Sequence, residues 1–199
     1  MRVNIKNKQS TLYLARHGES EWNIAFRLQG QLDSPLTEKG IEQATKLSKF
    51  CHDKQIHCIV SSTLNRAHHT GQVCQQNLNV NHISNPKLVE RHLGQWQGKI
   101  YSELSNLPIF DEVFHKVTNI APPDGESALA CRARINTALS HLAQTYVQQN
   151  ILVITHGEAM RCFISQYQNI TNNAYNQYEN GSAVPLSYCH DTDRFSLLS

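Results

Sequence analysis

The chain alternates between short runs of consecutive apolar residues and longer stretches in which apolar residues recur at helical spacing. Four apolar runs, bounded by polar residues as buried strands are, lie at 11–15, 56–60, 80–83 and 151–155, with that at 80–83 the weakest. Near the end, 182–188 and 194–198 predict two further strands about the polar turn 190–193. The pattern therefore predicts a sheet of about six strands.

Helical periodicity fills the intervals between the predicted strands. Thr37 is a favourable cap for a helix whose apolar stripe is Ile41, Ala44, Leu47, Phe50 and Cys51. Three more helices are predicted by the apolar sets Ala67, Thr70, Val73 and Cys74; Leu129, Ile135, Leu139, Leu142 and Tyr146; and Met160, Phe163 and Ile164. Strands that alternate with helices favour an α/β fold: a three-layer α/β/α sandwich with a mostly parallel central sheet and an antiparallel edge.

The organisation is that of a single domain over residues 1–199, because neither a repeat nor a linker interrupts the pattern. The segment 100–123 is the least regular, and Pro108, Pro122 and Pro123 break it.

Composition narrows the possible partners. Eighteen Lys and Arg against sixteen Asp and Glu leave a formal charge of +2, without a basic cluster, so nucleic-acid binding is disfavoured. Neither a membrane-spanning apolar stretch nor a secretory signal is evident, and we expect a cytoplasmic protein without membrane association. The oligomeric state is not predicted by the sequence.

The six cysteines form no CxxC pair and lie mostly in apolar segments, which predicts reduced, mostly buried thiols. Cys51-His52 and His57-Cys58 are the one combination that resembles a metal cluster. Their spacing does not match that of a zinc finger, and we expect no metal.

The chemistry concentrates where three predicted strands end. Arg16-His17-Gly18 follows the first strand, Thr155-His156-Gly157 follows the run at 151–155, and Ser61-Ser62 leads to Arg66. In an open parallel sheet these ends meet at one crevice, so two imidazoles and two guanidiniums should converge there. Such a set suits an oxyanion, and Arg in particular matches phosphate geometry. We expect glycine after each histidine to allow a sharp turn and a close backbone approach to the ligand.

The ordered motifs resemble those of the histidine phosphatase superfamily, the phosphoglycerate mutase-like proteins. The resemblance rests on Leu14 to Ser20 (LARHGES), Trp22-Asn23, Leu28 to Gly30, Ser34 to Gly40, Gln43-Ala44, Ser61-Ser62, Arg66-Ala67, Thr70, Glu90 to Gly98, Pro123 to Ser127, Thr155 to Gly157 and Asn180 to Ser182. A lone RHG triplet is weak evidence, whereas this ordered series through most of the chain is strong.

The resemblance implies phosphoryl transfer through a phosphohistidine, without metal or other cofactor. His17 would be the nucleophile, with its second ring nitrogen bonded to backbone. Arg16, Arg66 and His156 would bind the phosphoryl oxygens, and Asn23 matches a further phosphate-binding position. Glu90 matches the general acid, whose pKa a bound phosphate dianion would raise.

Three functions follow from this resemblance. The stretch between Glu90 and His156 is shorter than in the mutases that the chain resembles, which favours a phosphatase acting on a small phosphorylated metabolite. Alpha-ribazole 5'-phosphate or a broad range of phosphomonoesters is the expected substrate. A mutase is the alternative, because Glu90-Arg91-His92 is mutase-like and Gln97 stands where many of the phosphatases carry Glu. A non-catalytic phospholigand-binding module is the second alternative, which the presence of both His17 and Glu90 disfavours.

Other residues have structural interpretations beside functional ones. The resemblance implies that the segment 100–123 is a lid that determines substrate specificity. Within it, His115 and Lys116 would suit a second anionic group and Phe110 or Phe114 a ring, although all four are ordinary residues of a helical lid. Trp22 and Trp96 could line the mouth of the site, but a packing role is favoured for both. The remaining expectations are a helix start at Glu126-Ser127, turn glycines at Gly30 and Gly125, and a solvent-facing pair at His68-His69.

Overall fold

The computed structural model describes residues 8–168 and 177–198 and contains a six-stranded sheet of order β3-β2-β4-β1-β5-β6. Strands β1 to β4 are parallel, whereas β5 is antiparallel to β1 and β6 is antiparallel to β5. The strands are β1 (Gln9–Arg16), β2 (Ile56–Ser61), β3 (Asn81–Ser84), β4 (Asn150–Thr155), β5 (Ala183–Cys189) and β6 (Arg194–Leu197). The predicted mostly parallel sheet with an antiparallel edge is confirmed.

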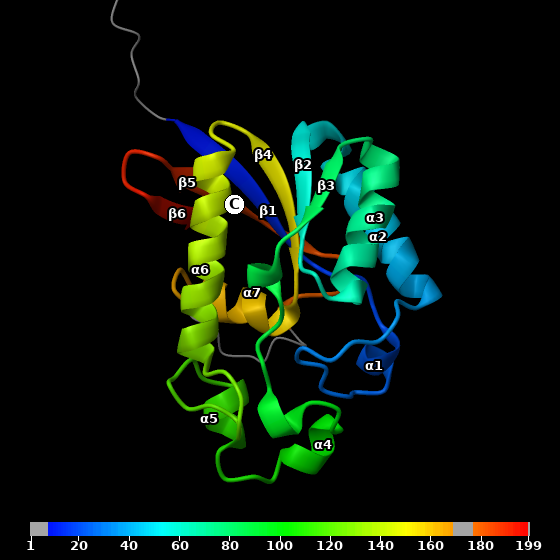
Figure 1. Ribbon diagram of the computed structural model, residues 1–199, viewed down its shortest axis with the longest axis vertical. Coiled ribbons are helices and arrows are strands. Elements are labelled where there is room, and N and C mark those ends of the chain that lie inside the picture. Colours follow the sequence, from blue (N-terminus) through cyan, green and yellow to red (C-terminus); the bar gives the residue numbers. More distant parts are fainter. Residues whose placement is uncertain (1–7, 169–176, 199) are drawn as a thin grey trace, which may run out of the picture.

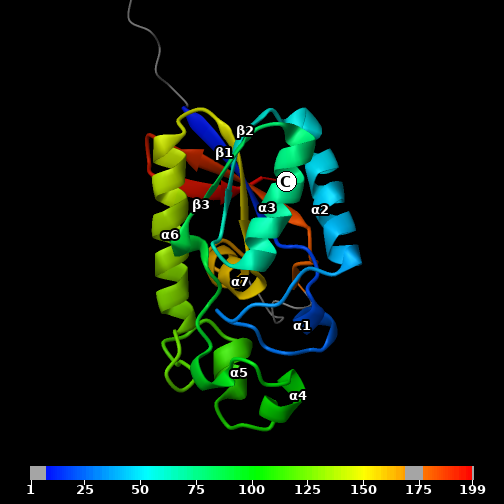
Figure 2. The same cartoon turned by 45° about the vertical axis from the view of Figure 1, so that its right-hand side comes forward.

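Helices cover both faces of this sheet (Figures 1 and 2). Helices α2 and α3 lie on one face, and α6 and α7 lie on the other. The helices of the described residues are α1 (Glu21–Ile24), α2 (Glu38–Cys51), α3 (Asn65–Leu78), α4 (Tyr101–Leu104), α5 (Phe110–Phe114), α6 (Ala128–Thr145) and α7 (Gly157–Ile164), with short 3₁₀ turns η1 (His52–Lys54), η2 (Pro86–Leu88) and η3 (Gly94–Trp96). The architecture is the expected three-layer sandwich.

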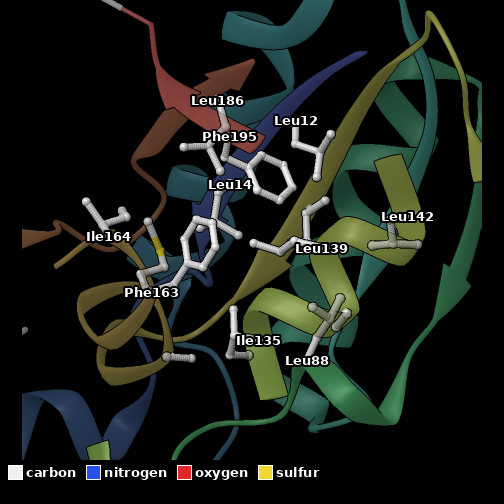
Figure 3. Packing of buried hydrophobic residues seen from close by; sticks show 14 of the residues in the cluster. Leu12, Leu14, Leu88, Ile135, Leu139, Leu142, Phe163, Ile164, Leu186 and Phe195 are labelled. Atoms are coloured by element: carbon white, nitrogen blue, oxygen red, sulfur yellow. The ribbon is translucent and has the colours of Figure 1, made fainter. Parts of the chain in front are cut away.

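Alternation along the strands divides the core in two. Leu12 and Leu14 of β1 face α6 and α7 in a cluster that includes Leu139 and Phe163 (Figure 3), whereas Ala15 faces the α2 and α3 side. Both halves are built from side chains with almost no solvent exposure, which fixes the register of the strands.

The stripe predicted for α2 is wrong at two of its five residues, Ile41 and Phe50. Ala44, Leu47 and Cys51 are buried, but Ile41 is 39% and Phe50 48% exposed. Helix α2 packs through a narrow stripe against α3 and the sheet, so apolar residues at the flanks of that stripe remain in solvent.

Two helices begin at the predicted caps. The Thr37 hydroxyl accepts a hydrogen bond from Gly40 N at 3.0 Å, and the Ser127 hydroxyl accepts one from Ala130 N at 3.1 Å. The helix-start interpretation of Glu126-Ser127 is therefore confirmed.

The segment 100–123 forms the short helices α4 and α5, beyond the carboxyl ends of the parallel strands (Figure 1). Phe110 and Phe114 are buried in an aromatic cluster with Trp96, which stacks on Phe114 at 5.7 Å between ring centroids. Packing is thus the role of Trp96, and the segment carries its own small apolar core.

Remaining expectations concern cysteines, histidines and membranes. Cys51, Cys58, Cys74, Cys131, Cys162 and Cys189 are free thiols, of which all but Cys189 are buried. Over residues 8–168 and 177–198, no group of three or more His, Cys, Asp or Glu is placed to hold a metal ion, and no helix is long and apolar enough to cross a membrane.

The solvent-facing prediction for the tandem histidines of α3 is wrong. His68 and His69 are half-buried, and the His68 ring lies 5.0 Å from that of His82. Strand β3 lies beside α3, which brings a third histidine against the helix.

Candidate active site

The strand register brings the predicted site residues to one edge of the sheet. Arg16 pairs with Thr155 across β1 and β4, and Ser61 pairs with Ile154 across β2 and β4. The residues that follow these strand ends are therefore neighbours, and the rings of His17 and His156 lie 5.2 Å apart between centroids. These distant segments meet because the carboxyl ends of neighbouring parallel strands lie at the same edge of the sheet, as expected.

His17 is buried, and its hydrogen bonds define its tautomer. Its Nδ1 lies 2.7 Å from the Gly18 carbonyl oxygen, which only accepts, so Nδ1 carries the hydrogen. Arg66 Nε, which only donates, lies 3.3 Å from Nε2, so Nε2 holds a lone pair. Burial lowers the pKa of His17 well below its ordinary value, and the charges of Arg66 and Arg16 lower it further. His17 is therefore a neutral imidazole with Nε2 as its nucleophilic atom.

Arg66, the second residue of α3, is held by the loop that precedes α2. Its two terminal nitrogens donate to the carbonyl oxygens of Gly30 and Leu32, each at 2.8 Å. Asp33 pairs with the same guanidinium at 3.0 Å and also accepts from Asn65 N at the start of α3. Asp33 was not singled out from the sequence, although it lies beside the SPLT turn. The guanidinium is thus a fixed positive charge beside His17.

Arg16 and Asn23 also border the site. Arg16 is the last residue of β1 and donates to the Tyr178 carbonyl oxygen at 2.7 Å. The Asn23 side-chain oxygen accepts from Ser20 N at 3.1 Å and from Asn180 Nδ2 at 3.3 Å. The oxygen end of the amide is therefore occupied by donors, which leaves its NH₂ end for a ligand.

His156 occupies the N-cap position of α7 and is fully buried. Its Nε2 lies 2.8 Å from the Ser62 hydroxyl, whereas its buried Nδ1 has no hydrogen-bond partner among residues 8–168 and 177–198. Burial lowers the pKa of His156 well below its ordinary value, and the charges of Arg66 and His17 act in the same direction. A neutral imidazole with one uncommitted nitrogen thus faces the His17 ring.

Glu90 lies in the loop after η2 and is buried against the start of α7. Its carboxylate accepts from Ala159 N and Arg91 N at 2.8 Å and from Glu158 N at 3.1 Å. Burial raises the pKa of Glu90 and the nearby Glu158 charge raises it further, although the hydrogen bonds from Arg91 and Ala159 oppose this. The structure thus raises this pKa without the bound phosphate that the sequence analysis invoked.

A buried ionic cluster behind Glu90 was missed from the sequence. Glu158 pairs with Arg161 at 2.8 Å and with Arg91 at 3.3 Å, and all three residues are buried. Burial alone would raise the pKa of Glu158, but the Arg161 and Arg91 guanidiniums hold it below its ordinary value. The available signal was the spacing of Glu158 and Arg161, which places them on one helix face.

The glycine after His17 makes a close backbone contact with the start of α2. A Cβ at Gly18 would lie 2.3 Å from the Gly40 carbonyl oxygen, and a Cβ at Gly40 would lie 2.1 Å from that of Glu19. The His17 loop and the start of α2 are therefore in close backbone contact, which requires glycine at both positions.

A cavity opens at the centre of these residues. Its polar walls are Arg16, His17, Asn23, Gln29, Arg66, Glu90 and Glu158, and its other walls are Leu28, Gly30, Leu93, Phe114 and Gly157. His156 is not part of this lining, since its ring lies buried against His17. Of the described residues that line the cavity, Arg16 and Arg66 are the cations.

The polar lid residues lie away from this lining. His115 pairs with Asp111 at 3.0 Å, and Lys116 pairs with Glu112 on the exposed side of α5. Phe114 lines the cavity, whereas Phe110 packs within the aromatic cluster. Gln97 accepts from Gln31 N at 2.8 Å, so its side chain joins two loops of the site wall.

Comparisons with known proteins show the family to which the chain belongs. The family model of the histidine phosphatase superfamily, branch 1, matches residues 12–199. The probable phosphoglycerate mutase GpmB of Proteus mirabilis is 33% identical over 159 residues, which cover 77% of this chain and 73% of the relative. The chain belongs to the histidine phosphatase superfamily.

Solved structures show the same fold. Bacillus stearothermophilus YhfR superposes with a TM-score of 0.83 at 30% identity, covering 94% of this chain and 95% of that one. A mycobacterial glucosyl-3-phosphoglycerate phosphatase with VO3 has a TM-score of 0.82 at 25% identity, with 96% and 98% covered. A candidate alpha-ribazole-5'-P phosphatase of Escherichia coli K-12 has a TM-score of 0.77 at 24% identity, with 95% and 94% covered, which shows the fold alone. The superfamily is thus represented among the neighbours by both phosphatases and mutase-like proteins.

Proposed function

We propose that this enzyme is a phosphatase that hydrolyses a small phosphomonoester through a phosphohistidine on His17. The observation that carries the proposal is the neutral His17 ring, which holds a lone pair on Nε2 and lines a cavity together with Arg16, Arg66 and Glu90. The two guanidiniums supply the positive charge that phosphoryl transfer needs, so the proposal includes no metal or other cofactor.

In the first step, His17 Nε2 attacks phosphorus while the bond from phosphorus to the ester oxygen breaks. The Arg66 Nε–H, which donates to Nε2 in the structure, turns to a phosphoryl oxygen as the nitrogen–phosphorus bond forms. Arg16 and the NH₂ end of Asn23 bind other phosphoryl oxygens from the cavity wall, and the buried His156, whose ring lies 5.2 Å from that of His17 between centroids, binds one from beside the nucleophile. Glu90, with its raised pKa, gives its proton to the departing alkoxide.

In the second step, water attacks the phosphohistidine and the nitrogen–phosphorus bond breaks. The Glu90 carboxylate takes the proton of that water, which restores the acid for the next turnover. Inorganic phosphate then leaves, and His17 returns to the neutral tautomer that the Gly18 carbonyl fixes.

The charges on the cavity wall favour hydrolysis over transfer to a second phosphate-bearing molecule. Among the described lining residues the cations are Arg16 and Arg66, both beside His17, and the wall also carries Glu90 and Glu158. A bisphosphate or phosphoglycerate would place its second anionic group near those carboxylates. Arg91, which follows Glu90 in the chain, is paired with Glu158.

We infer that the organic part of the substrate is uncharged. Leu28, Leu93 and Phe114 form the apolar part of the wall, which suits a sugar or an aromatic ring. Alpha-ribazole 5'-phosphate, a neutral riboside of an aromatic base, is the one named candidate with this chemistry, alongside a broad range of phosphomonoesters. The segment 100–123 would act as the specificity lid by contributing Phe114.

The test is hydrolysis of p-nitrophenyl phosphate with EDTA present. Wild type is expected to turn over and to yield an acid-labile phosphoenzyme, whereas His17→Ala loses more than about 10³-fold in kcat/KM. His141→Ala, which removes an exposed histidine of α6, is the matched control and keeps wild-type activity. Absence of both turnover and phosphoenzyme in wild type would refute the proposal and leave a phospholigand-binding module.

Phosphoglycerate mutase activity is the second candidate, because the Proteus mirabilis relative carries that name. The discriminating experiment offers 3-phosphoglycerate with a bisphosphate primer and, separately, a panel of sugar, nucleoside and ribazole phosphates. We expect phosphate release from the panel to exceed interconversion of phosphoglycerates. Primer-dependent interconversion as the faster reaction would replace the phosphatase assignment.

A further inference from the structure

The unassigned feature of the site is the hydrogen bond between Ser62 and His156. Ser62 Oγ lies 2.8 Å from His156 Nε2, and both side chains are fully buried. A hydroxyl donates or accepts, so this contact by itself is compatible with either neutral tautomer of the ring.

The surroundings of Ser62 decide the direction of that bond. Leu64 N donates to Ser62 Oγ at 3.2 Å and so occupies one of its lone pairs. The neighbouring Ser61 hydroxyl lies 3.1 Å from the Ser62 carbonyl oxygen and 2.8 Å from His82 Nε2, so it is engaged with these two groups and not with Ser62 Oγ. Among the described residues, Ser62 Oγ has these two hydrogen-bond partners, Leu64 N and His156 Nε2. Because Leu64 N can only donate, the hydroxyl hydrogen of Ser62 must be donated to His156 Nε2. A buried hydroxyl hydrogen without an acceptor is unfavourable, because the group has lost its hydrogen bond to water.

The consequence is a hydrogen on the other ring nitrogen. With Nε2 accepting from Ser62, the neutral ring carries its hydrogen on Nδ1, the buried atom that has no partner in the described residues. A buried N–H that lacks an acceptor is suited to an incoming oxyanion. The opposite tautomer would present a lone pair there and repel a phosphoryl oxygen.

We propose that Ser62 is a positioning residue that holds His156 in the Nδ1–H tautomer, and that this Nδ1–H is the donor to a phosphoryl oxygen. The second part rests on the proposed function; the first part does not. His17 and His156 then share one tautomer but use opposite ends of the ring. His17 directs its Nε2 lone pair to phosphorus, and His156 directs its Nδ1–H to oxygen.

Long-range proton–nitrogen NMR spectra of the full chain test the first part directly, because they distinguish protonated from unprotonated ring nitrogens. The His156 signals are assigned from their loss in His156→Gln. We expect hydrogen on Nδ1 in wild type and in Ser61→Ala, the matched control, and a mixture or the other tautomer in Ser62→Ala. Hydrogen on Nε2 in wild type would overturn the inference, even if Ser62→Ala failed to fold.

Inorganic phosphate tests the second part. Titration with phosphate should shift the Nδ1–H resonance downfield in wild type, with little shift in Ser62→Ala; an unmoved wild-type resonance at saturating phosphate contradicts the donor role. In turnover, Ser62→Ala should lose on the order of tenfold in kcat, less than the 10²–10³ of an oxyanion donor removed outright, and Ser62→Thr should restore it. Wild type that hydrolyses no ester but shows Nδ1–H refutes the proposed function and supports the tautomer assignment.

Discussion

The imidazole of His17 donates to a carbonyl and accepts from a guanidinium, two partners that cannot reverse their roles. Its protonation is therefore a property of the folded site. The protonation of Glu90 is not fixed in this way, because opposing influences act on its pKa. Burial and the charge of Glu158 raise the pKa, whereas hydrogen bonds from backbone N–H groups lower it. An acid that both gives and takes a proton in one cycle benefits from such balanced influences.

Glu90→Gln tests this acid role through the leaving group. Alkyl phosphates need a proton on the departing oxygen, so kcat/KM should fall by about 10²–10³-fold. p-Nitrophenyl phosphate, which releases a stable phenolate, should lose no more than about tenfold in its phosphorylation step. Steady-state kinetics with both esters give the comparison, and equal losses for the two would exclude Glu90 as the acid.

At the scale of elements, the site depends on a contact between two backbones. The loop after β1 and the first turn of α2 approach so closely that Gly18 and Gly40 leave no space for a Cβ. Sequence patterns predicted both elements and identified both glycines, but not that the glycines face each other. That contact is set by how α2 packs on the sheet, which local periodicity does not encode.

Gly40→Ala should therefore destabilise the protein, against the usual trend. Replacing a helix glycine with alanine ordinarily stabilises by about 0.5–1 kcal/mol. Here the new methyl group would lie 2.1 Å from the Glu19 carbonyl oxygen, so the free energy of unfolding should fall by about 1–3 kcal/mol. Urea unfolding measures the change, with the exposed Gln76→Ala of α3 as a control expected to stay within about 0.5 kcal/mol. A Gly40→Ala variant more stable than wild type would show that the backbone around Glu19 can move away from the new methyl group.

At the scale of the whole molecule, the site buries several ionisable groups in one place, and this couples stability to pH. The pKa values of His17 and His156 are lowered in the folded state by burial and by neighbouring positive charge. Below the ordinary histidine pKa, these two histidines bind protons in the unfolded chain but stay neutral in the folded site, so the free energy of unfolding falls. Glu90, whose pKa is raised by burial and Glu158, acts in the opposite direction.

Thermal unfolding from pH 7.5 downward tests this coupling. Above pH about 6.5 both histidines are neutral in the folded and the unfolded chain, and the free energy of unfolding is not reduced by their titration. It falls as the pH decreases from there toward their folded pKa values. His17→Gln should lose less stability than wild type over the same interval, while His141→Gln, at an exposed position, should follow the wild-type profile. Parallel profiles for wild type and His17→Gln would contradict the lowered pKa.

The sequence by itself determined the strands, the main helices, the parallel sheet with its antiparallel edge, and the residues that gather at the carboxyl ends of the parallel strands. These depend on local periodicity and on motifs that keep their order along the chain. Tertiary structure alone decided that Ser62 lies against His156, that Arg91 pairs with Glu158, and that Gly18 lies against Gly40. Each of these contacts joins segments far apart in the chain, and buried polar groups choose their partners by distance and geometry once the core has packed.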